Sequence, residues 1–378
     1  MNLLNLETSE LTLHRYPATN DPNLQAWDAA DEYLLRELTA EQLQNAASQG
    51  PILILNDSFG ALTCGLAHYQ PIAISDSLLS QEATRRNWQT NELEELPLHL
   101  QDALAPLPTA PALVLIKVPK TLAMLEYQLL RLREVVTAET RIIAAGKVKE
   151  IHNSTLALFE QILGATKTSL AWKKARLILP QVEDRPVVAN PYPTHWPLDN
   201  TDYQIANHAN VFARASLDIG ARFLLEHLPR QKRGLMVDLG CGNGVLGLMA
   251  LEYNPEAELL FLDESYMAVA SSQLNVENNR PQDLARSRFQ VGHSLSGIDS
   301  NSLDVIICNP PFHQLQTITD DIAWQMFRDA KRCLKRGGEL WIVGNRHLDY
   351  HIKLKRLFGG AECIASNSKF VILRSINR

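Results

Sequence analysis

Residues 303–312 read Leu303-Asp304-Val305-Ile306-Ile307-Cys308-Asn309-Pro310-Pro311-Phe312. The apolar run predicts a buried strand, and the two prolines end it, because proline donates nothing to a ladder and fixes its own φ. Such a turn presents the Asn309 amide and the Pro310 carbonyl as acceptors, with the Phe312 ring beside them. This set suits a planar group that carries an NH2, such as the exocyclic amine of a nucleobase. The alternative is a plain Pro-Pro turn capped by a core phenylalanine.

Around this stretch, the C-terminal half alternates strand-like and helical patterns. The predicted strands are 235–238, 258–262, 288–291, 303–308, 339–343, 361–365 and 370–373, and the predicted helices are 245–252, 266–278 and 322–334. This alternation predicts an α/β, doubly wound and mostly parallel seven-stranded sheet with helices on both faces. The short connection 366–369 is too short for a crossover, so the last two strands should form an antiparallel hairpin.

The N-terminal half repeats this plan in order and spacing. Its runs 52–57, 72–77 and 113–120 parallel 235–238, 261–265 and 305–312, and Asn87 and Asn91 fall opposite Asn275 and Asn279. Two unrelated α/β domains are the alternative; we expect two tandem Rossmann-like domains. Prolines at 180, 186, 191, 193 and 197 predict a stiff linker over 181–200, between domains at 1–180 and 201–378.

The N-terminal copy lacks the features that suggest chemistry. Of the glycines at 240, 242, 244 and 247, its shorter loop 57–61 keeps only Gly60. Lys117 and Lys120 stand where the other half has Asn309 and Phe312. Lysine is a compact cation that suits phosphate. We therefore expect 1–180 to be a degenerate domain that recognises RNA or acts as a scaffold.

Length and composition are those of a soluble globular protein. The 378 residues suffice for two domains, and 46% hydrophobic with 21% charged residues is an ordinary balance. We find no signal peptide and no apolar run near the roughly 18–20 residues of a membrane span. The five cysteines are scattered without ligand spacing, so we expect reduced thiols, a cytoplasmic location and no metal site.

Charge is distributed unevenly along the chain. The net charge is -6, yet 117–176 carries 11 basic and 5 acidic residues, and 328–378 carries 12 and 4. Such blocks can present a positive face to phosphates, although they also suit the outer faces of ordinary helices. Trp172, Lys173, Lys174 and Arg176 combine an aromatic ring with three cations, as RNA surfaces often do; an exposed strand edge is the alternative.

A glycine loop follows the first strand of the C-terminal half. It reads Asp238-Leu239-Gly240-Cys241-Gly242-Asn243-Gly244. Without Cβ atoms, such a loop turns sharply and approaches a ligand closely. Asp263 ends the next strand, where a carboxylate can accept both hydroxyls of a ribose. Residues 242–247 also match G-x-G-x-x-G, so a nicotinamide dinucleotide stays open. However, Asp238 would lie close to a diphosphate, whereas it suits an α-ammonium.

These motifs together resemble class I S-adenosylmethionine-dependent N-methyltransferases whose fourth strand ends in (N/D)PP(Y/F). More closely, the chain is similar to the bacterial ribosomal RNA guanine-N2 methyltransferases, which carry a degenerate N-terminal copy of the catalytic domain. The carrying segments are 211–220, 238–244 and 309–313, and segments 13–19, 172–176 and 345–350 resemble the large-subunit enzymes of that group. His293 departs from the wider pattern, because a carboxylate often follows strand three there.

The resemblance implies a function and a set of site residues. The expected reaction methylates the N2 amine of a guanine in 23S ribosomal RNA, with S-adenosylmethionine as cofactor and a monomeric enzyme without metal or membrane. The expected catalytic residues are Asn309, Pro310 and Phe312. The cofactor would bind Asp238, Gly240, Cys241, Gly242, Gly244 and Asp263. The RNA would contact Pro311, His313, Phe212, Lys117, Lys120, Lys173 and Lys174.

Other functions remain open at this point. Within methyltransferases, the same Asn-Pro-Pro-Phe turn could bind adenine N6, the N2 amine of a small-subunit guanine or a glutamine amide in a protein. From other classes, a nicotinamide oxidoreductase and a non-catalytic RNA-binding protein are the alternatives. His313 has a plain structural alternative to proton removal or RNA contact. Phe212 and Asp218 could line the substrate or methionine side of the pocket, and ordinary helix-capping and core roles are the alternatives.

Overall fold

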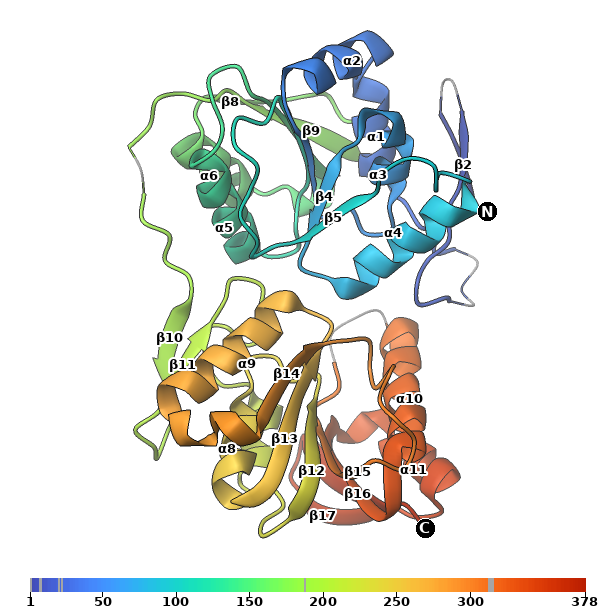
Figure 1. Cartoon of the computed structure of the whole chain (residues 1–378), viewed down its shortest axis with the longest axis vertical. Coiled ribbons are helices and arrows are strands. Elements are labelled where there is room, and N and C mark those ends of the chain that lie inside the picture. The colour runs from blue at the N-terminus through green and yellow to red at the C-terminus, as the bar shows by residue number, and fades with distance from the viewer. Residues whose placement is uncertain (1, 7–8, 20, 22, 187, 312–315) are drawn as a thin grey trace. The chain divides into compact units, whose positions relative to one another are not determined.

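The computed structural model describes the chain except residues 1, 7–8, 20, 22, 187 and 312–315, and of 316–320 it describes the backbone alone (Figure 1). The chain divides into two compact units, Met1–Pro191 and Tyr192–Arg378. Each unit contains one seven-stranded, mostly parallel sheet with helices around it. The predicted α/β class and duplicated architecture are therefore confirmed.

The sheet of the second unit has the order β14-β13-β12-β15-β16-β18-β17. Its strands are β12 (Arg233–Leu239), β13 (Glu256–Asp263), β14 (Ser287–Val291), β15 (Leu303–Cys308), β16 (Leu334–Asn345), β17 (Glu362–Ser366) and β18 (Phe370–Ile376). β12 to β16 pair in parallel, whereas β18 is antiparallel to both β16 and β17. The predicted terminal hairpin is present.

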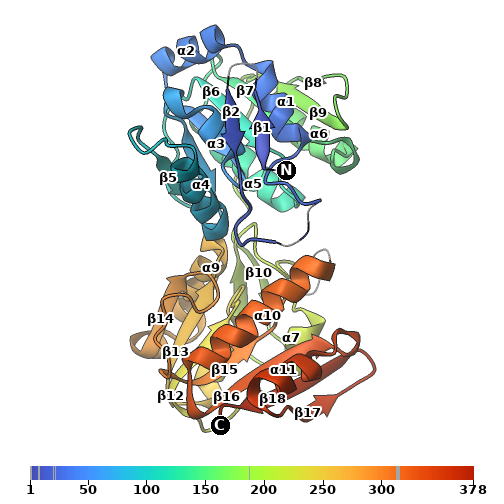
Figure 2. The same cartoon turned by 90° about the vertical axis from the view of Figure 1, so that its right-hand side faces the viewer.

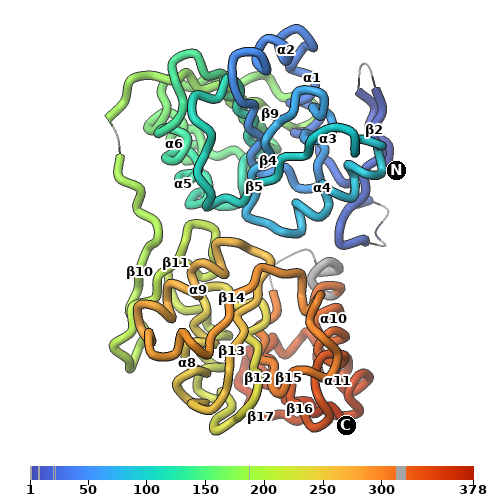
Figure 3. The backbone as a smooth tube through the Cα atoms, viewed as in Figure 1, coloured from blue at the N-terminus to red at the C-terminus, as the bar shows by residue number. Residues whose placement is uncertain are grey.

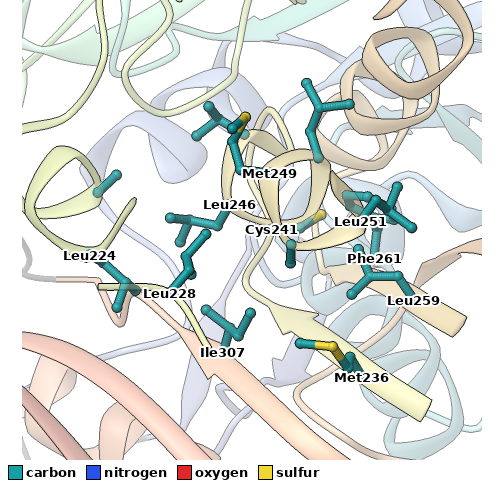
Figure 4. Close-up of a cluster of buried hydrophobic side chains, with 14 of the residues drawn as sticks. Leu224, Leu228, Met236, Cys241, Leu246, Met249, Leu251, Leu259, Phe261 and Ile307 are labelled. Atoms are coloured by element: carbon teal, nitrogen blue, oxygen red, sulfur yellow. The ribbon is translucent and has the colours of Figure 1, made fainter. Parts of the chain in front are cut away.

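Helices cover both faces of this sheet, because its strands are apolar on both sides. The helices α7 (Ile219–Leu225), α8 (Val245–Tyr253) and α9 (Tyr266–Asn279) pack on one face, and α10 (Gln316–Cys333) and α11 (Tyr350–Phe358) on the other (Figure 2). Met236 and Phe261 face the first layer, and Val237 faces the second. Figure 4 shows part of the first core, where Leu224 of α7 and Leu246 of α8 join these side chains. The sequence patterns missed α7 and α11.

The first unit repeats the arrangement, with the strand order β5-β4-β3-β6-β7-β9-β8. Its strands are β3 (Ile52–Leu55), β4 (Ile72–Ser75), β5 (His99–Asp102), β6 (Leu113–Lys117), β7 (Arg141–Lys147), β8 (Thr166–Thr168) and β9 (Ala175–Pro180). The helices α1 (Ala29–Glu37), α2 (Ala40–Gln49) and α3 (Ala61–Gly65) pack on one face, and α5 (Leu122–Arg133) and α6 (Asn153–Ile162) on the other.

Short 3-10 helices occur in both units. They lie at Ala67–Tyr69 and Val148–Glu150 in the first unit, and at Pro281–Arg286 and Arg346–Leu348 in the second.

Each unit also carries a small hairpin that a helix asparagine holds in place. These hairpins are β1 (Leu3–Asn5) with β2 (Glu10–Thr12), and β10 (Thr194–Pro197) with β11 (Gln204–Asn207) (Figure 3). On α4 (Leu78–Thr90), Asn87 accepts from the His14 N–H at 2.8 Å and donates to its carbonyl at 2.9 Å. On α9, Asn275 bonds Ala206 in the same way, at 2.6 and 2.9 Å. The repeat thus extends to individual side chains.

The expected linker 181–200 is only partly irregular. The described residues of 181–193 form no helix or strand, whereas 194–197 form β10 and pair with β11. The strand tolerates Pro197 because this residue ends it, and β10 lies in a two-stranded sheet where one edge needs no donor. Among the described residues, no helix is long and apolar enough to cross a membrane.

Candidate active site

Three parallel strands of the second unit end side by side. In the register of the sheet, Leu239 of β12 lies between Leu262 of β13 and Cys308 of β15. Because neighbouring strands are about 4.8 Å apart, the residues that follow them gather at one edge. These residues are the glycine loop, Asp263 and Asn309. Ligands bind at such carboxyl edges in open α/β sheets.

The glycine loop adopts a conformation that requires glycine. Gly240, Gly242 and Gly244 have φ angles of +70°, +55° and +77°, a region that side chains with a Cβ avoid. A Cβ on Gly244 would lie 2.6 Å from the Ser272 Oγ and 2.9 Å from its Cα. A Cβ on Gly242 would instead meet none of the described heavy atoms within 4 Å. The loop therefore packs against α9 on one side and is open on the other, as a ligand-holding loop needs.

Asp238 is a buried carboxylate with one unused acceptor. It is 1% exposed, and its Oδ2 accepts a hydrogen bond from the Gly247 N–H at 2.8 Å. Its Oδ1 is buried and has no hydrogen-bond partner within the described part of the chain. Burial, and then the nearby charge of Asp263, raise the pKa of Asp238 to about 8. Since an unpaired buried charge is costly, this site fits a cationic ligand group.

Asp263 and Cys241 complete the loop in different ways. The two oxygens of Asp263 accept from the Ser265 and Gly242 N–H groups, both at 3.0 Å. Burial raises the pKa of this carboxyl although backbone N–H groups lower it. The Cys241 thiol is 7% exposed and accepts from the Ser272 hydroxyl at 3.2 Å, and burial raises its pKa well above the usual range. Cys241 is therefore an uncharged core thiol, and only its backbone belongs to the loop.

Asn309 follows β15 with its amide held on one side only. Its Nδ2 donates to the Asp218 Oδ2 at 3.3 Å, while its Oδ1 is buried and finds no partner among the residues that the structure describes. Pro310 is buried and Pro311 is half-buried behind it. An unused, buried amide oxygen can accept a hydrogen bond from an N–H group that is brought to it. Sequence reasoning named Asp218 as a residue that could line the pocket or cap a helix, but it did not predict the contact with Asn309.

The remaining predicted substrate residues are less well defined. Phe312 and His313 lie outside the described residues. Phe212 is 55% exposed on the segment between β11 and α7, which Asp218 ends. His293 follows β14 at the same edge of the sheet, where the Gly292 N–H donates to the Asp263 carbonyl at 2.8 Å.

The equivalent edge of the first unit has its ligand groups occupied by the protein itself. Asp57 uses both oxygens, on the N–H groups of Gly60 at 3.0 Å and Thr63 at 2.8 Å. Gly60 begins α3 with a φ angle of +88°, just as Gly244 begins α8. The hydroxyl of Ser75 accepts from the next helix cap at 3.1 Å, where the second unit has Asp263. Asp57 thus has both oxygens engaged by backbone N–H groups, whereas Asp238 of the second unit keeps one oxygen without a partner among the described residues.

The sequence predicted that Lys117 contacts RNA phosphate, but in the structure two carboxylates engage its ammonium group. Its side chain is only 11% exposed, and its Nζ lies 2.8 Å from both the Asp28 Oδ1 and the Asp31 Oδ2. Burial alone would lower the pKa of Lys117, but the charges and hydrogen bonds of the two carboxylates outweigh it and raise that pKa. The lysine is therefore part of a buried ion pair. Lys120, in contrast, is exposed.

Lys173 and Lys174 form an exposed turn beside an aromatic ring. Both have positive φ angles, of 45° and 66°, at the start of β9. The Lys173 Nζ lies 4.6 Å from the centre of the Trp172 ring and 2.5 Å from the Glu32 Oε2. The Arg36 guanidinium lies 4.9 Å from the same ring. The turn thus has two exposed lysines beside one aromatic ring, and Arg36 of α1 contacts the same ring.

Comparisons with known proteins agree with this picture. The family model of the RLMG N-terminal domain matches residues 1–184, and that of the Methyltransferase small domain matches 202–374. A ribosomal RNA large subunit methyltransferase G from Aeromonas salmonicida is 60% identical and covers 100% of this chain and 99% of its own. A protein of the same name from Erwinia tasmaniensis is also 60% identical, with the same coverage.

Among solved structures, the 16S rRNA N2 G1207 methyltransferase of T. thermophilus, in complex with AdoMet and guanosine, has the same fold. It aligns with a TM-score of 0.75 at 19% identity, covering 100% of this chain and 97% of its own. The full-length identity to curated relatives and the two family models decide the assignment. The chain belongs to the ribosomal RNA large subunit methyltransferase G family.

Proposed function

We propose that the second unit transfers a methyl group from S-adenosylmethionine to the exocyclic N2 amine of a guanine in 23S ribosomal RNA. The observation that carries this proposal is the unused, buried Oδ1 of Asn309 beside a glycine loop that is open on one side. A dinucleotide in that loop would place a diphosphate close to the buried carboxylate of Asp238. Family membership also favours methyl transfer over the nicotinamide alternative.

The loop and two carboxylates fit the cofactor. The Asp238 Oδ1 would accept from its α-ammonium, and Asp263 would accept from its ribose hydroxyls. The open side of Gly242 would let the backbone approach it, and Gly240 and Gly244 give the loop its shape. The cofactor supplies a sulfonium methyl with an already activated leaving group. Orientation and proximity are therefore what the protein has to provide.

Asn309 and Pro310 would orient the attacking amine. A guanine amine is a poor nucleophile, because its lone pair is delocalised into the ring. Hydrogen bonds from its two hydrogens to the Asn309 Oδ1 and the Pro310 carbonyl favour a tetrahedral nitrogen whose lone pair points at the methyl group. Phe312 would stack on the base, a contact worth roughly 1–3 kcal/mol. The guanine has to be unpaired or flipped out of its helix to reach the turn at 309–312.

We propose that the first unit helps to bind the RNA. Its exposed turn with Trp172, Lys173 and Lys174 combines stacking with positive charge, and Lys120 adds an exposed cation. In the second unit, Phe212 and Pro311 lie exposed or half-buried on segments that reach the Asn309 edge, where they suit the substrate side. His313 directly follows the 309–312 turn in the sequence, so we assign it to the substrate side as well.

Labelled methyl transfer onto RNA from cells that lack this protein tests the proposal. We expect incorporation into 23S ribosomal RNA at one guanine, found by mapping the modified nucleotide. A synthetic RNA with inosine at that position lacks only the N2 amine and should accept no label. Asn309→Ala should lower transfer to a small residual rate that is still measurable, and it should leave the cofactor Kd unchanged. Label on adenine, on a protein glutamine or on the inosine RNA, or full activity of Asn309→Ala, would contradict the proposed chemistry.

A further inference from the structure

The amide of Asn309 has two orientations, and only one presents an acceptor to the substrate. Its Nδ2 lies 3.3 Å from the Asp218 Oδ2. Carboxylate oxygens only accept hydrogen bonds, so the amide atom beside Asp218 has to be the NH2 group. The Oδ1 is thereby turned away from Asp218, and it is the atom that is buried and lacks a partner among the described residues. The contact with Asp218 therefore selects the orientation that the reaction needs.

Asp218 is itself fixed by the start of α7. It is the N-cap of that helix, and its Oδ2 accepts from the Ala221 N–H at 2.9 Å. Gly220 lies in the same turn and is buried; a Cβ there would be 3.1 Å from the Asp218 Oδ2 and 3.7 Å from the Asn309 Oδ1. A glycine leaves this space free. The helix cap thus holds one carboxylate oxygen at a defined place beside the amide.

The first unit contains the same juxtaposition. Asp28 is the N-cap of α1, and the side chain at the end of β6, Lys117, donates to its Oδ1 at 2.8 Å. In their sheets, α1 contacts β7 and β9, as α7 contacts β16 and β18. Both copies therefore join a helix-cap aspartate to a residue at the carboxyl end of the central strand, which is the last residue of β6 and the first residue after β15. Lysine has donors only, whereas the amide in the second unit keeps one acceptor for the substrate.

We propose that Asp218 is a positioning residue for methyl transfer, because it fixes the orientation of the Asn309 amide. The inference rests on the proposed function of Asn309. Without the carboxylate, the amide can rotate and place its NH2 group against the donor hydrogens of the guanine amine. The substrate then loses an acceptor and meets a donor. The loss should appear in kcat and not in the binding of the cofactor.

Asp218→Ser is the informative variant, with Asp218→Asn as its matched control. Serine is also a good N-cap, but it is too short to reach Asn309. Asparagine keeps a cap and an acceptor oxygen. We expect a kcat roughly 10- to 100-fold lower for Asp218→Ser, near-normal kcat for Asp218→Asn, and an unchanged cofactor Kd and melting temperature for both.

Two double variants separate positioning from a merely structural role. Asp218→Ser should cost nothing further in the Asn309→Ala background, because the amide that it positions is gone. Asn309→Asp alone opposes two carboxylates, and adding Asp218→Asn should restore part of the lost activity, since one donor again faces one acceptor. Full kcat in Asp218→Ser, additive losses in the first pair, or no recovery in the second would overturn the inference. If Asn309→Ala itself stayed active, the proposed function would fail instead.

Discussion

Replacing Lys117 by methionine should destabilise the first unit without touching the chemistry of the second. Lys117 neutralises Asp31, whose side chain is 6% exposed, and Asp28, which is 33% exposed. Methionine keeps most of the side-chain volume but removes the cation shared by the two carboxylates. Lys147, whose Nζ lies 3.5 Å from the Asp28 Oδ2, still faces Asp28, whereas the mostly buried Asp31 loses its ion pair with Lys117. Removing one partner of a buried ion pair costs about 3–5 kcal/mol. Because water reaches Asp28, we expect the lower end, about 3 kcal/mol.

The pH dependence of this cost has a defined sign. Burial and the neighbouring charges of Asp28 and Asp57 already hold the pKa of Asp31 above its ordinary value, although Lys117 lowers it. Without Lys117, this pKa rises further, so the folded variant binds more protons than the folded wild type at mildly acidic pH. As pH falls, the free energy of unfolding of the variant therefore rises relative to that of the wild type. The difference in stability should be smaller at pH 5.5 than at pH 7.5.

Urea unfolding combined with hydrogen exchange measures this effect in the full chain. Peptides that cover α1 and β6 should exchange faster in Lys117→Met, whereas peptides from Tyr192–Arg378 and the cofactor Kd should not change. Lys120→Met is the matched control on an exposed lysine, and it should change stability by no more than about 0.5 kcal/mol. Equal stability of Lys117→Met and Lys120→Met, or a cost that grows on acidification, would refute the ion-pair reasoning.

Three further predictions concern the second unit. Asp238 has a raised pKa of about 8, so cofactor binding to its charged form should release a proton, and the affinity should fall by up to about tenfold for each pH unit below 8. Calorimetry in buffers of different ionisation enthalpy measures the released proton. Cofactor binding that does not depend on pH would contradict this prediction. Gly242→Ala should mainly weaken cofactor binding, because its Cβ points into open space, whereas Gly244→Ala should also lower the melting temperature, because its Cβ meets Ser272. Asn275→Ala removes the hydrogen bonds that hold β11 and should cost about 2–3 kcal/mol in urea unfolding; a loss below about 0.5 kcal/mol would show that the clamp is unimportant.

Much of the fold followed from local patterns in the sequence. Alternating apolar runs and helical periods are set by the chain itself, so strands such as β15 and helices such as α8 could be located closely. The repeat was visible in the sequence because Asn87 and Asn275 have equivalent spacing in the two halves. In the structure, each accepts a hydrogen bond from a backbone N–H group in or next to a small hairpin. The helix α7 was missed, because its seven residues give a weak periodic signal. The helix α11 was missed although it has nine residues, as α8 does. β10 was missed because Pro193, just before it, and Pro197, its last residue, suggested a linker.

The sequence by itself determined which chemical groups lie at the carboxyl edge of each sheet, since a motif that follows a strand has to sit where that strand ends. Only the tertiary structure decided which of those groups are free to act. Lys117 and Asp28 are 89 positions apart, and Asn309 and Asp218 are 91 positions apart. Whether a side chain is buried, paired or left with an unused acceptor depends on these distant contacts. Lysine at a strand end is therefore part of an internal ion pair, whereas asparagine at the equivalent place has an amide oxygen without a partner among the described residues.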